Sequence, residues 1–197
     1  SSGKNILDIG CGTGEFLFQC SRNGFNVYGV EPDKDARFLA NRLNSNNILD
    51  SISKIENFPV MDIITLLHSL EHIHQLHASL QHICNRLTQT GVLIIAVPNR
   101  KSYDADLYGK YWAAYDVPRH LYHFSPESMQ YLLKLYGFQI NHMLPLKFDS
   151  YYISLLSEKY KYGSKNPIRA IINGYKSNSY GKKTKHYSSL IYIATKC

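Results

Sequence analysis

Three alternating glycines and two carboxylates near the N-terminus have the types and spacing needed to hold a nucleoside-like ligand. Gly10, Gly12 and Gly14 follow Asp8, after an apolar segment typical of a buried strand. Glycines let a ligand approach the backbone closely, and a carboxylate without a nearby basic residue suits a cationic amino group better than a phosphate. Glu31 lies 17 residues past Gly14. There its carboxylate can accept hydrogen bonds from both ribose hydroxyls of a nucleoside.

A second group of chemically active residues follows a later apolar segment. His68, Glu71 and His72 lie where that strand would end, and His74, His77 and His82 come soon after. Imidazole and carboxylate groups at the carboxyl edge of a sheet could bind a transition metal or zinc. The alternative is that Glu71 and His72 shape a ligand pocket while the later histidines lie on a helix surface. We assign no metal site from the sequence.

The segment 100–124 lacks regular periodicity and is rich in aromatic, histidine and charged residues, as functional loops often are. His120 is the leading candidate for a general base because the usual pKa of histidine lies near neutrality. Arg119 could hold an acidic substrate group. The aromatic faces of Trp112 and Tyr115, together with His123, could contact the substrate and exclude water. An equally open alternative is that Arg119 and His120 only fix the loop to the sheet by hydrogen bonds.

The surrounding pattern alternates strands and helices, which predicts a mostly parallel sheet covered by helices. Strands are expected at 5–9, 26–30, 47–52, 62–67, 92–97, 138–144 and 190–195, and helices at 15–23, 33–44, 74–87 and from 125 to a stop at Gly137. The segment 149–187 is a Tyr- and Lys-rich insertion before the last strand, expected to be partly helical.

These motifs resemble the class I S-adenosylmethionine-dependent methyltransferases, through residues 7–14, 31–33, 62–72 and 91–99. The resemblance implies one Rossmann-like α/β domain over 1–197, with a seven-stranded sheet, an antiparallel last strand and helices on both faces. It also implies that S-adenosylmethionine contacts a set of residues that we carry over position by position: Asp8, Gly10, Cys11, Gly12, Gly14, Glu31, Pro32, Ser51, Ile52 and His68. Ser51 stands where many members have an adenine-binding Asp, with Asp50 as a competitor one residue away.

Residues 62–72 also look like the acidic motif of ubiquinone-biosynthesis O-methyltransferases, with His68 replacing an expected Glu. The resemblance implies in-line methyl transfer to a small molecule, at oxygen, with His120, Arg119 and His72 as catalytic candidates. A divalent metal is disfavoured. The competing functions are RNA methylation, which the basic tail would suit, and NAD-dependent oxidoreduction, which the GxGxG spacing disfavours.

Composition sets further limits. The 197 residues are 44% hydrophobic and carry a net charge of +7, and no apolar run approaches the roughly 20 residues that span a bilayer. Four scattered cysteines fit a reducing cytoplasm.

Residues 158–197 hold nine Lys or Arg and one acid, a balance of +8 that leaves about −1 for the rest of the chain. An insertion with both apolar and basic residues suits a cap for an amphiphilic or anionic acceptor, or contact with a membrane surface. The equally open alternative is a solvated basic face that keeps the protein in solution. The start at Ser1 suggests that an N-terminal segment is missing.

Overall fold

A single seven-stranded sheet organises the chain, and its strand order is β3-β2-β1-β4-β5-β7-β6. The computed structural model describes residues 4–197. The strands are β1 Asn5–Ile9, β2 Asn26–Val30, β3 Ile48–Leu49, β4 Met61–Leu67, β5 Leu87–Pro98, β6 Phe138–Pro145 and β7 Ser189–Lys196. Strands β1 to β5 pair in parallel, and β7 runs antiparallel to both β5 and β6. The predicted sheet and its antiparallel last strand are confirmed.

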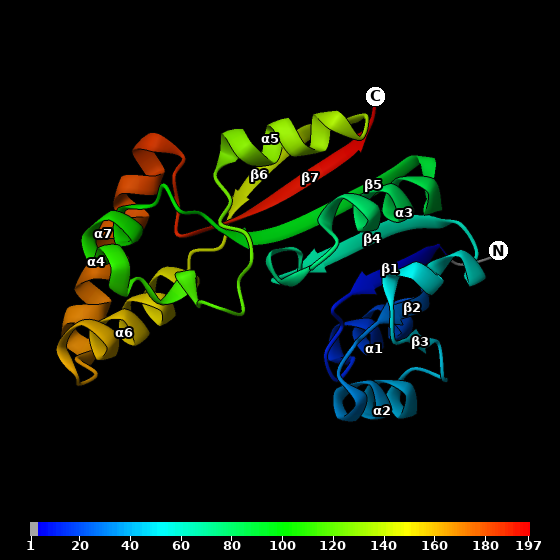
Figure 1. Ribbon diagram of the computed structural model, residues 1–197, viewed down its shortest axis with the longest axis horizontal. Helices are drawn as coiled ribbons and strands as arrows, with labels where there is room; N and C mark the ends of the chain where they lie inside the picture. Colours follow the sequence, from blue (N-terminus) through cyan, green and yellow to red (C-terminus); the bar gives the residue numbers. More distant parts are fainter. Residues whose placement is uncertain (1–3) are drawn as a thin grey trace.

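Helices cover both faces of the sheet because successive strand residues point to opposite sides. Ile6 packs with Leu17 of α1 (Glu15–Arg22) and Ala40 of α2 (Lys34–Leu43). Leu7 belongs to the larger core on the other face, which includes α3 (Leu76–Arg86) and α5 (Pro126–Leu135). The carboxyl ends of β1, β4 and β5 therefore open toward one end of the molecule (Figure 1).

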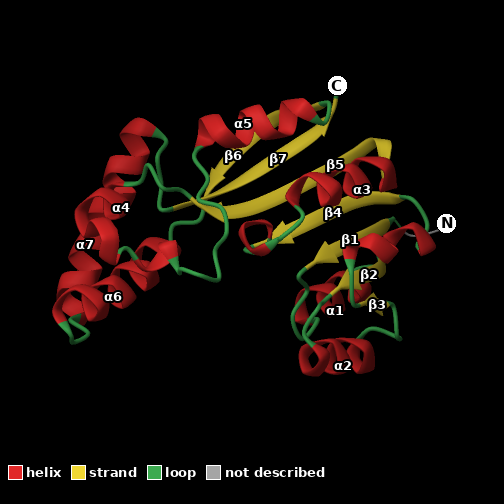
Figure 2. Cartoon of the chain, viewed as in Figure 1, coloured by secondary structure: helices red, strands yellow, loops and turns green. Residues whose placement is uncertain are grey.

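A helical lobe lies beyond that end of the sheet (Figure 2). It consists of α4 (Tyr103–Tyr108), α6 (Asp149–Tyr162) and α7 (Pro167–Thr184), with the short 3₁₀ turns η3 (Gly109–Tyr111) and η4 (Ala113–Tyr115). Two buried carboxylates hold it together: Asp104 accepts hydrogen bonds from Trp112, Ser177 and Ser188, and Glu158 accepts one from Tyr108. The insertion before β7 is thus a helical hairpin.

Three sequence expectations differ from the structure. The strand expected at 47–52 is only two residues long, because Ser51 caps the 3₁₀ helix η1 (Ile52–Asn57). The helix expected to reach residue 87 ends at Arg86, and β5 begins at Leu87, earlier than expected. The segment 100–124 is more regular than predicted, since Ser102 caps α4. Within residues 4–197, none of the helices has the length and apolar character needed to span a bilayer.

Candidate functional site

Each of the three glycines after β1 is required, or tolerated, for a different structural reason. A side chain at Gly10 would collide with Ser69, whose Cβ would lie only 2.5 Å from the added Cβ. A side chain at Gly14 would collide with Asn44, so this glycine allows α1 and α2 to approach closely. At Gly12 an added Cβ meets nothing within 4 Å, and the backbone there has a φ of +55°. Gly12 is therefore the glycine that faces open space where a ligand could lie.

Asp8 lies beneath this loop and is only 3% exposed. Its carboxylate accepts a hydrogen bond of 2.6 Å from the Thr65 hydroxyl. Burial raises the pKa of Asp8 to about 6, and the nearby charge of Glu31 acts in the same direction. Asp8 thus supports the loop from below and is not among the residues that line the cavity above it.

The side chain of Cys11 turns away from the loop and packs in the core around α1. Burial raises the pKa of its thiol to about 12, which disfavours the thiolate form. Any contact of Cys11 with a ligand would therefore come from its backbone.

Glu31 joins the end of β2 to the glycine loop. Its carboxylate accepts the backbone N–H of Gly12 at 2.8 Å and that of Asp33 at 2.9 Å. Each oxygen keeps further lone pairs, so the same carboxylate can accept hydroxyl groups from a ligand. Glu31 therefore lies beside the glycine loop, and the sequence analysis expects one nucleoside-like ligand to contact both.

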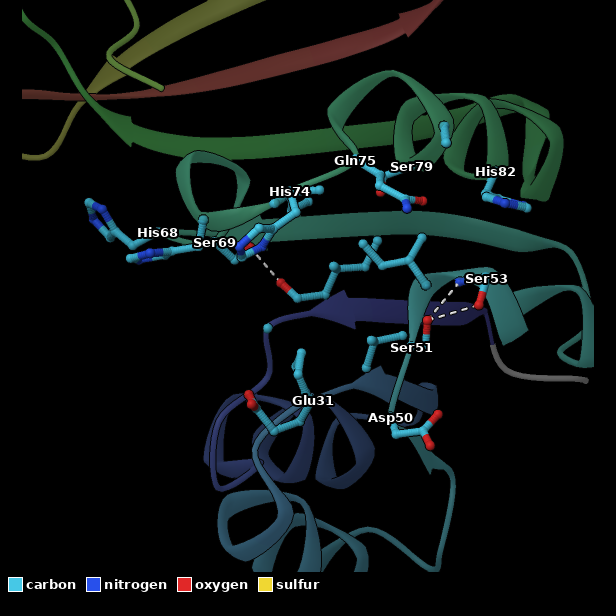
Figure 3. A pocket seen from close by; sticks show the side chains of 18 residues that line it. Glu31, Asp50, Ser51, Ser53, His68, Ser69, His74, Gln75, Ser79 and His82 are labelled. Atoms are coloured by element: carbon cyan, nitrogen blue, oxygen red, sulfur yellow. Dashed lines mark hydrogen bonds between the residues drawn. The ribbon is translucent and has the colours of Figure 1, made fainter. Parts of the chain in front are cut away.

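A cavity of about 760 Å³ opens beside Glu31, above the carboxyl ends of β1, β2 and β4. Figure 3 shows Glu31, Asp50 and Ser51 on one side of it, with His74, Gln75 and His82 across from them. Of the expected ligand-binding residues, those lining the cavity are Gly10, Glu31, Pro32, Ser51, Ile52 and His68. Asp50 also lines it, but its carboxylate forms an ion pair of 2.8 Å with Lys54.

His68 follows β4 at the mouth of this cavity and is held by two carboxylates. Its Nε2 lies 3.1 Å from Asp149 at the start of α6, and its Nδ1 lies 3.6 Å from Glu71. Desolvation acts to lower the pKa of His68, but these carboxylates outweigh it and raise the pKa to about 9. His68 is therefore positively charged at neutral pH, and it links the sheet to the lobe.

His72 and His120 meet edge to face beside the buried Glu71, with ring centroids 4.7 Å apart. Nδ1 of His120 lies 2.8 Å from the carbonyl oxygen of Ala114, so Nδ1 carries the hydrogen and Nε2 keeps a free lone pair. Burial lowers the pKa of His120. Nδ1 of His72 lies 2.9 Å from the carbonyl oxygen of Arg119, so it is the donor there.

Glu71 is the central acid of this histidine cluster. It is 1% exposed, and neither of its oxygens accepts a hydrogen bond from the described residues. Ligand atoms of Glu71, His72 and His120 lie within 4.8 Å of one another. This set differs from the metal set considered from the sequence, because His120 joins it while His68 pairs with Asp149.

A second cavity of about 340 Å³ lies between His68 and the lobe. His68 lines both cavities, so they adjoin. Arg119 and His120, both catalytic candidates from the sequence, line the second cavity, and Asp116 forms an ion pair of 2.7 Å with Arg119. Its apolar wall comes from α6, with Tyr152, Ile153, Leu156 and Tyr160.

The structure corrects the place of Trp112. Its ring is 2% exposed, its Nε1 donates to the buried Asp104, and it does not line the second cavity. Tyr115 packs edge to face on both Trp112 and His123, and His123 contacts the carbonyl oxygen of Tyr115 through Nε2 at 2.9 Å. Trp112 is therefore a packing residue behind the Ala113–Asp116 turn, whereas Tyr115 and His123 are half-buried and Tyr115 lines a separate cavity with Arg100 and Tyr180.

Sequence reasoning missed the roles of Asp116 and Asp149 at the second cavity. Asp149 was only the first residue of an expected insertion, and nothing in its neighbourhood along the chain points to a contact with His68. The contact arises because α6 folds back over the end of β4. The available signal was the presence of only two acids, Asp149 and Glu158, in an insertion that is otherwise basic.

Comparison with known proteins adds an independent line of evidence. A family model described as a methyltransferase domain matches residues 1–143. The ubiquinone biosynthesis O-methyltransferase of Glaesserella parasuis is 29% identical over 136 residues, which cover 62% of this chain and 58% of that protein. The protein of the same name from Rickettsia bellii is 27% identical over 105 residues, covering 50% of this chain and 44% of its own length. The chain thus spans about half the length of these relatives.

Solved structures show the same fold at low sequence identity. Magnesium protoporphyrin IX methyltransferase from Synechocystis, crystallised with bound SAH, aligns with a TM-score of 0.63 at 16% identity, over 99% of this chain and 75% of that one. A SAM-dependent methyltransferase from Archaeoglobus fulgidus aligns with a TM-score of 0.65 at 20% identity, over 98% of this chain and 86% of that one.

Proposed function

Because this chain belongs to the methyltransferase-domain family, we propose that it transfers a methyl group from S-adenosylmethionine to an oxygen atom of a small molecule. The observation that carries the proposal is the adjacency of the two cavities at His68, with His120 lining the smaller one. The name that the relatives carry, ubiquinone biosynthesis O-methyltransferase, favours oxygen as the methylated atom.

The larger cavity fits the cofactor in its size and in the polar groups that line it. The backbone at Gly12 faces open space, and the carboxylate of Glu31, which lines the cavity, is an acceptor for ribose hydroxyls. Ser51 and Ile52 would hold the adenine end. When bound, S-adenosylmethionine supplies an electrophilic methyl group on a sulfonium, which needs no metal for its activation. The negative charge of Asp8 beneath the loop favours a cationic ligand.

His120 supplies the base. Its neutral form carries hydrogen on Nδ1, held by the Ala114 carbonyl, so Nε2 can accept the proton that the acceptor hydroxyl loses. The imidazolium that forms is stabilised by two carboxylates, since Nε2 lies 4.0 Å from Glu71 and 3.8 Å from Asp116. His72 borders the same cluster and restricts the orientation of the His120 ring.

The smaller cavity suits an amphiphilic or anionic acceptor. Ile153 and Leu156 offer an apolar wall, and Arg119 at the rim offers a cation that is 75% exposed and can exchange Asp116 for an acidic group of the substrate. Nucleic acid is a poorer fit because residues 1–157, which supply nearly all of the lining of both cavities, carry a balance of only about −1. The four cysteines are free, which fits our placement of the enzyme in the cytoplasm.

The test is transfer of radiolabelled methyl from S-adenosylmethionine to catechols with and without an apolar tail, with transfer RNA as a competing acceptor. We expect labelled phenolic ether that forms equally well with EDTA, and a loss of turnover in His120→Asn with unchanged cofactor binding. Label in RNA alone, or none with any phenol in a protein that binds cofactor, would refute the assignment.

A further inference from the structure

Helix α7 has an unusual distribution of residues between its two faces. Its buried positions are small or polar: Ala170, Asn173, Gly174, Ser177 and Gly181. Its long apolar side chains lie on the other face, in solvent. This is the reverse of the usual surface helix, which buries its apolar stripe against the core.

The inward face is small and polar because of what it contacts. Ser177 donates a hydrogen bond of 2.6 Å to the buried Asp104, and Asn173 donates one of 3.0 Å to the hydroxyl of Tyr108. Gly174 lies so close to Tyr151 of α6 that an added Cβ would come within 2.5 Å of the ring. Close packing on two buried polar networks therefore leaves no room for large apolar residues on this side of α7.

The outward face carries Ile168, Ile171, Ile172 and Tyr175, spaced i, i+3, i+4 and i+7, so they form one stripe. Their exposed fractions are 74%, 59%, 48% and 66%. Contiguous apolar stripes of this kind on a protein surface mark interaction sites. We call these four residues the α7 stripe.

The charges around the stripe indicate what it contacts. Helix α7 contains Arg169, Lys176, Lys182 and Lys183 and no Asp or Glu. A second copy of the same face would bring these cations together, which opposes self-association. The apolar stripe and the basic residues beside it would both be satisfied by a partner surface that is negatively charged above an accessible apolar layer. A membrane with anionic headgroups has that composition.

We propose that the α7 stripe docks on a membrane surface that contains anionic lipids, with Ile171 and Ile172 entering the interface and the lysines contacting headgroup phosphates. The inference goes beyond the proposed methyl transfer. Helix α6 packs along α7 and forms the apolar wall of the smaller cavity, so docking would bring that cavity close to molecules held in the membrane. Figure 1 shows α7 at the end of the molecule farthest from α2.

The experiment is sedimentation of the full chain with vesicles of phosphatidylcholine, alone or mixed with phosphatidylglycerol. The variant Ile171→Ser/Ile172→Ser removes the centre of the stripe. The matched control is Phe38→Ser/Leu39→Ser, which changes two apolar residues of α2 that are 61% and 48% exposed. Circular dichroism and titration with S-adenosylhomocysteine verify that each variant is folded.

We expect binding that requires phosphatidylglycerol, weakens with salt, drops roughly tenfold or more in the stripe variant and is unchanged in the control. Absence of binding, or equal loss in both variants, would overturn the proposal. So would concentration-dependent dimerisation without vesicles that the stripe variant abolishes, because the occupant would then be a second copy. These readouts need no methyl acceptor, so their failure leaves the proposed reaction untouched.

Discussion

Replacing Glu31 by Ala removes a carboxylate that serves both the loop and the cofactor. The side chain accepts the backbone N–H groups of Gly12 and Asp33. Losing these two bonds should lower the free energy of unfolding by about 1 to 2 kcal/mol, since both amides lie near the surface and can bind water instead. Losing the charge-assisted bonds to two ribose hydroxyls should weaken binding of S-adenosylhomocysteine by roughly 2 to 3 kcal/mol, about 30- to 150-fold in Kd.

The matched control is Asp33→Ala, two residues along the same loop. The Asp33 carboxylate caps α2 by accepting the N–H groups of Asp35 and Ala36, at 3.1 and 2.8 Å, and it does not line the cavity. This variant should lose about 1 kcal/mol of stability and keep its affinity. Isothermal titration and thermal unfolding measure the two effects separately. A folded Glu31→Ala protein with undiminished affinity, or equal loss of affinity in Asp33→Ala, would refute the assignment.

Three further predictions concern titratable side chains. Turnover should fall at low pH with a midpoint below 6.5, the ordinary pKa of histidine, because burial lowers the pKa of His120. His120→Asn should reduce kcat by about 100-fold or more. A midpoint above pH 7 would exclude His120 as the base. Asp8→Asn should stabilise the protein at pH 7.5 by up to roughly 2 to 3 kcal/mol in chemical denaturation, because the raised pKa of about 6 makes the charged carboxylate unfavourable in the fold. That gain should shrink as pH falls from 6 toward 4, and a gain independent of pH would contradict this cause. The pKa of His68 is raised to about 9, so His68 should stabilise the fold fully below pH 6.5 and lose this effect as pH rises through 9. The melting temperature of His68→Asn should therefore depend less on pH between 6.5 and 9 than that of the unchanged protein. An unchanged pH profile would count against the ion pair with Asp149.

Local sequence patterns predicted most strands of the sheet and pointed to several residues that the structure places around one cavity. The apolar segments around β1, β4 and β5 are strongly patterned, and the glycine loop and Glu31 lie next to strand ends, where their position follows from the parallel sheet. The antiparallel last strand came from the family resemblance and not from periodicity, which does not reveal strand direction.

The lobe was harder to predict because its structure depends on contacts between distant parts of the chain. Trp112 looked like an exposed aromatic face, but Asp104, eight residues earlier, accepts its indole hydrogen bond inside the lobe. The pairing of His68 with Asp149 joins residues that are far apart in sequence. Helix α7 has apolar spacing that suggests a core-facing stripe, and only the buried polar networks reverse which side faces inward.

The proposed reaction requires that the cofactor lie against Glu31 and present its methyl group to the cavity lined by His120. The most direct test is a crystal structure of the protein with S-adenosylhomocysteine and a catechol. We predict ribose hydroxyls within hydrogen-bonding distance of the Glu31 carboxylate, and a phenolic oxygen between the cofactor sulfur and Nε2 of His120. A cofactor bound elsewhere, or a sulfur atom that faces away from His120 while catechol occupies another site, would contradict this arrangement of the two cavities.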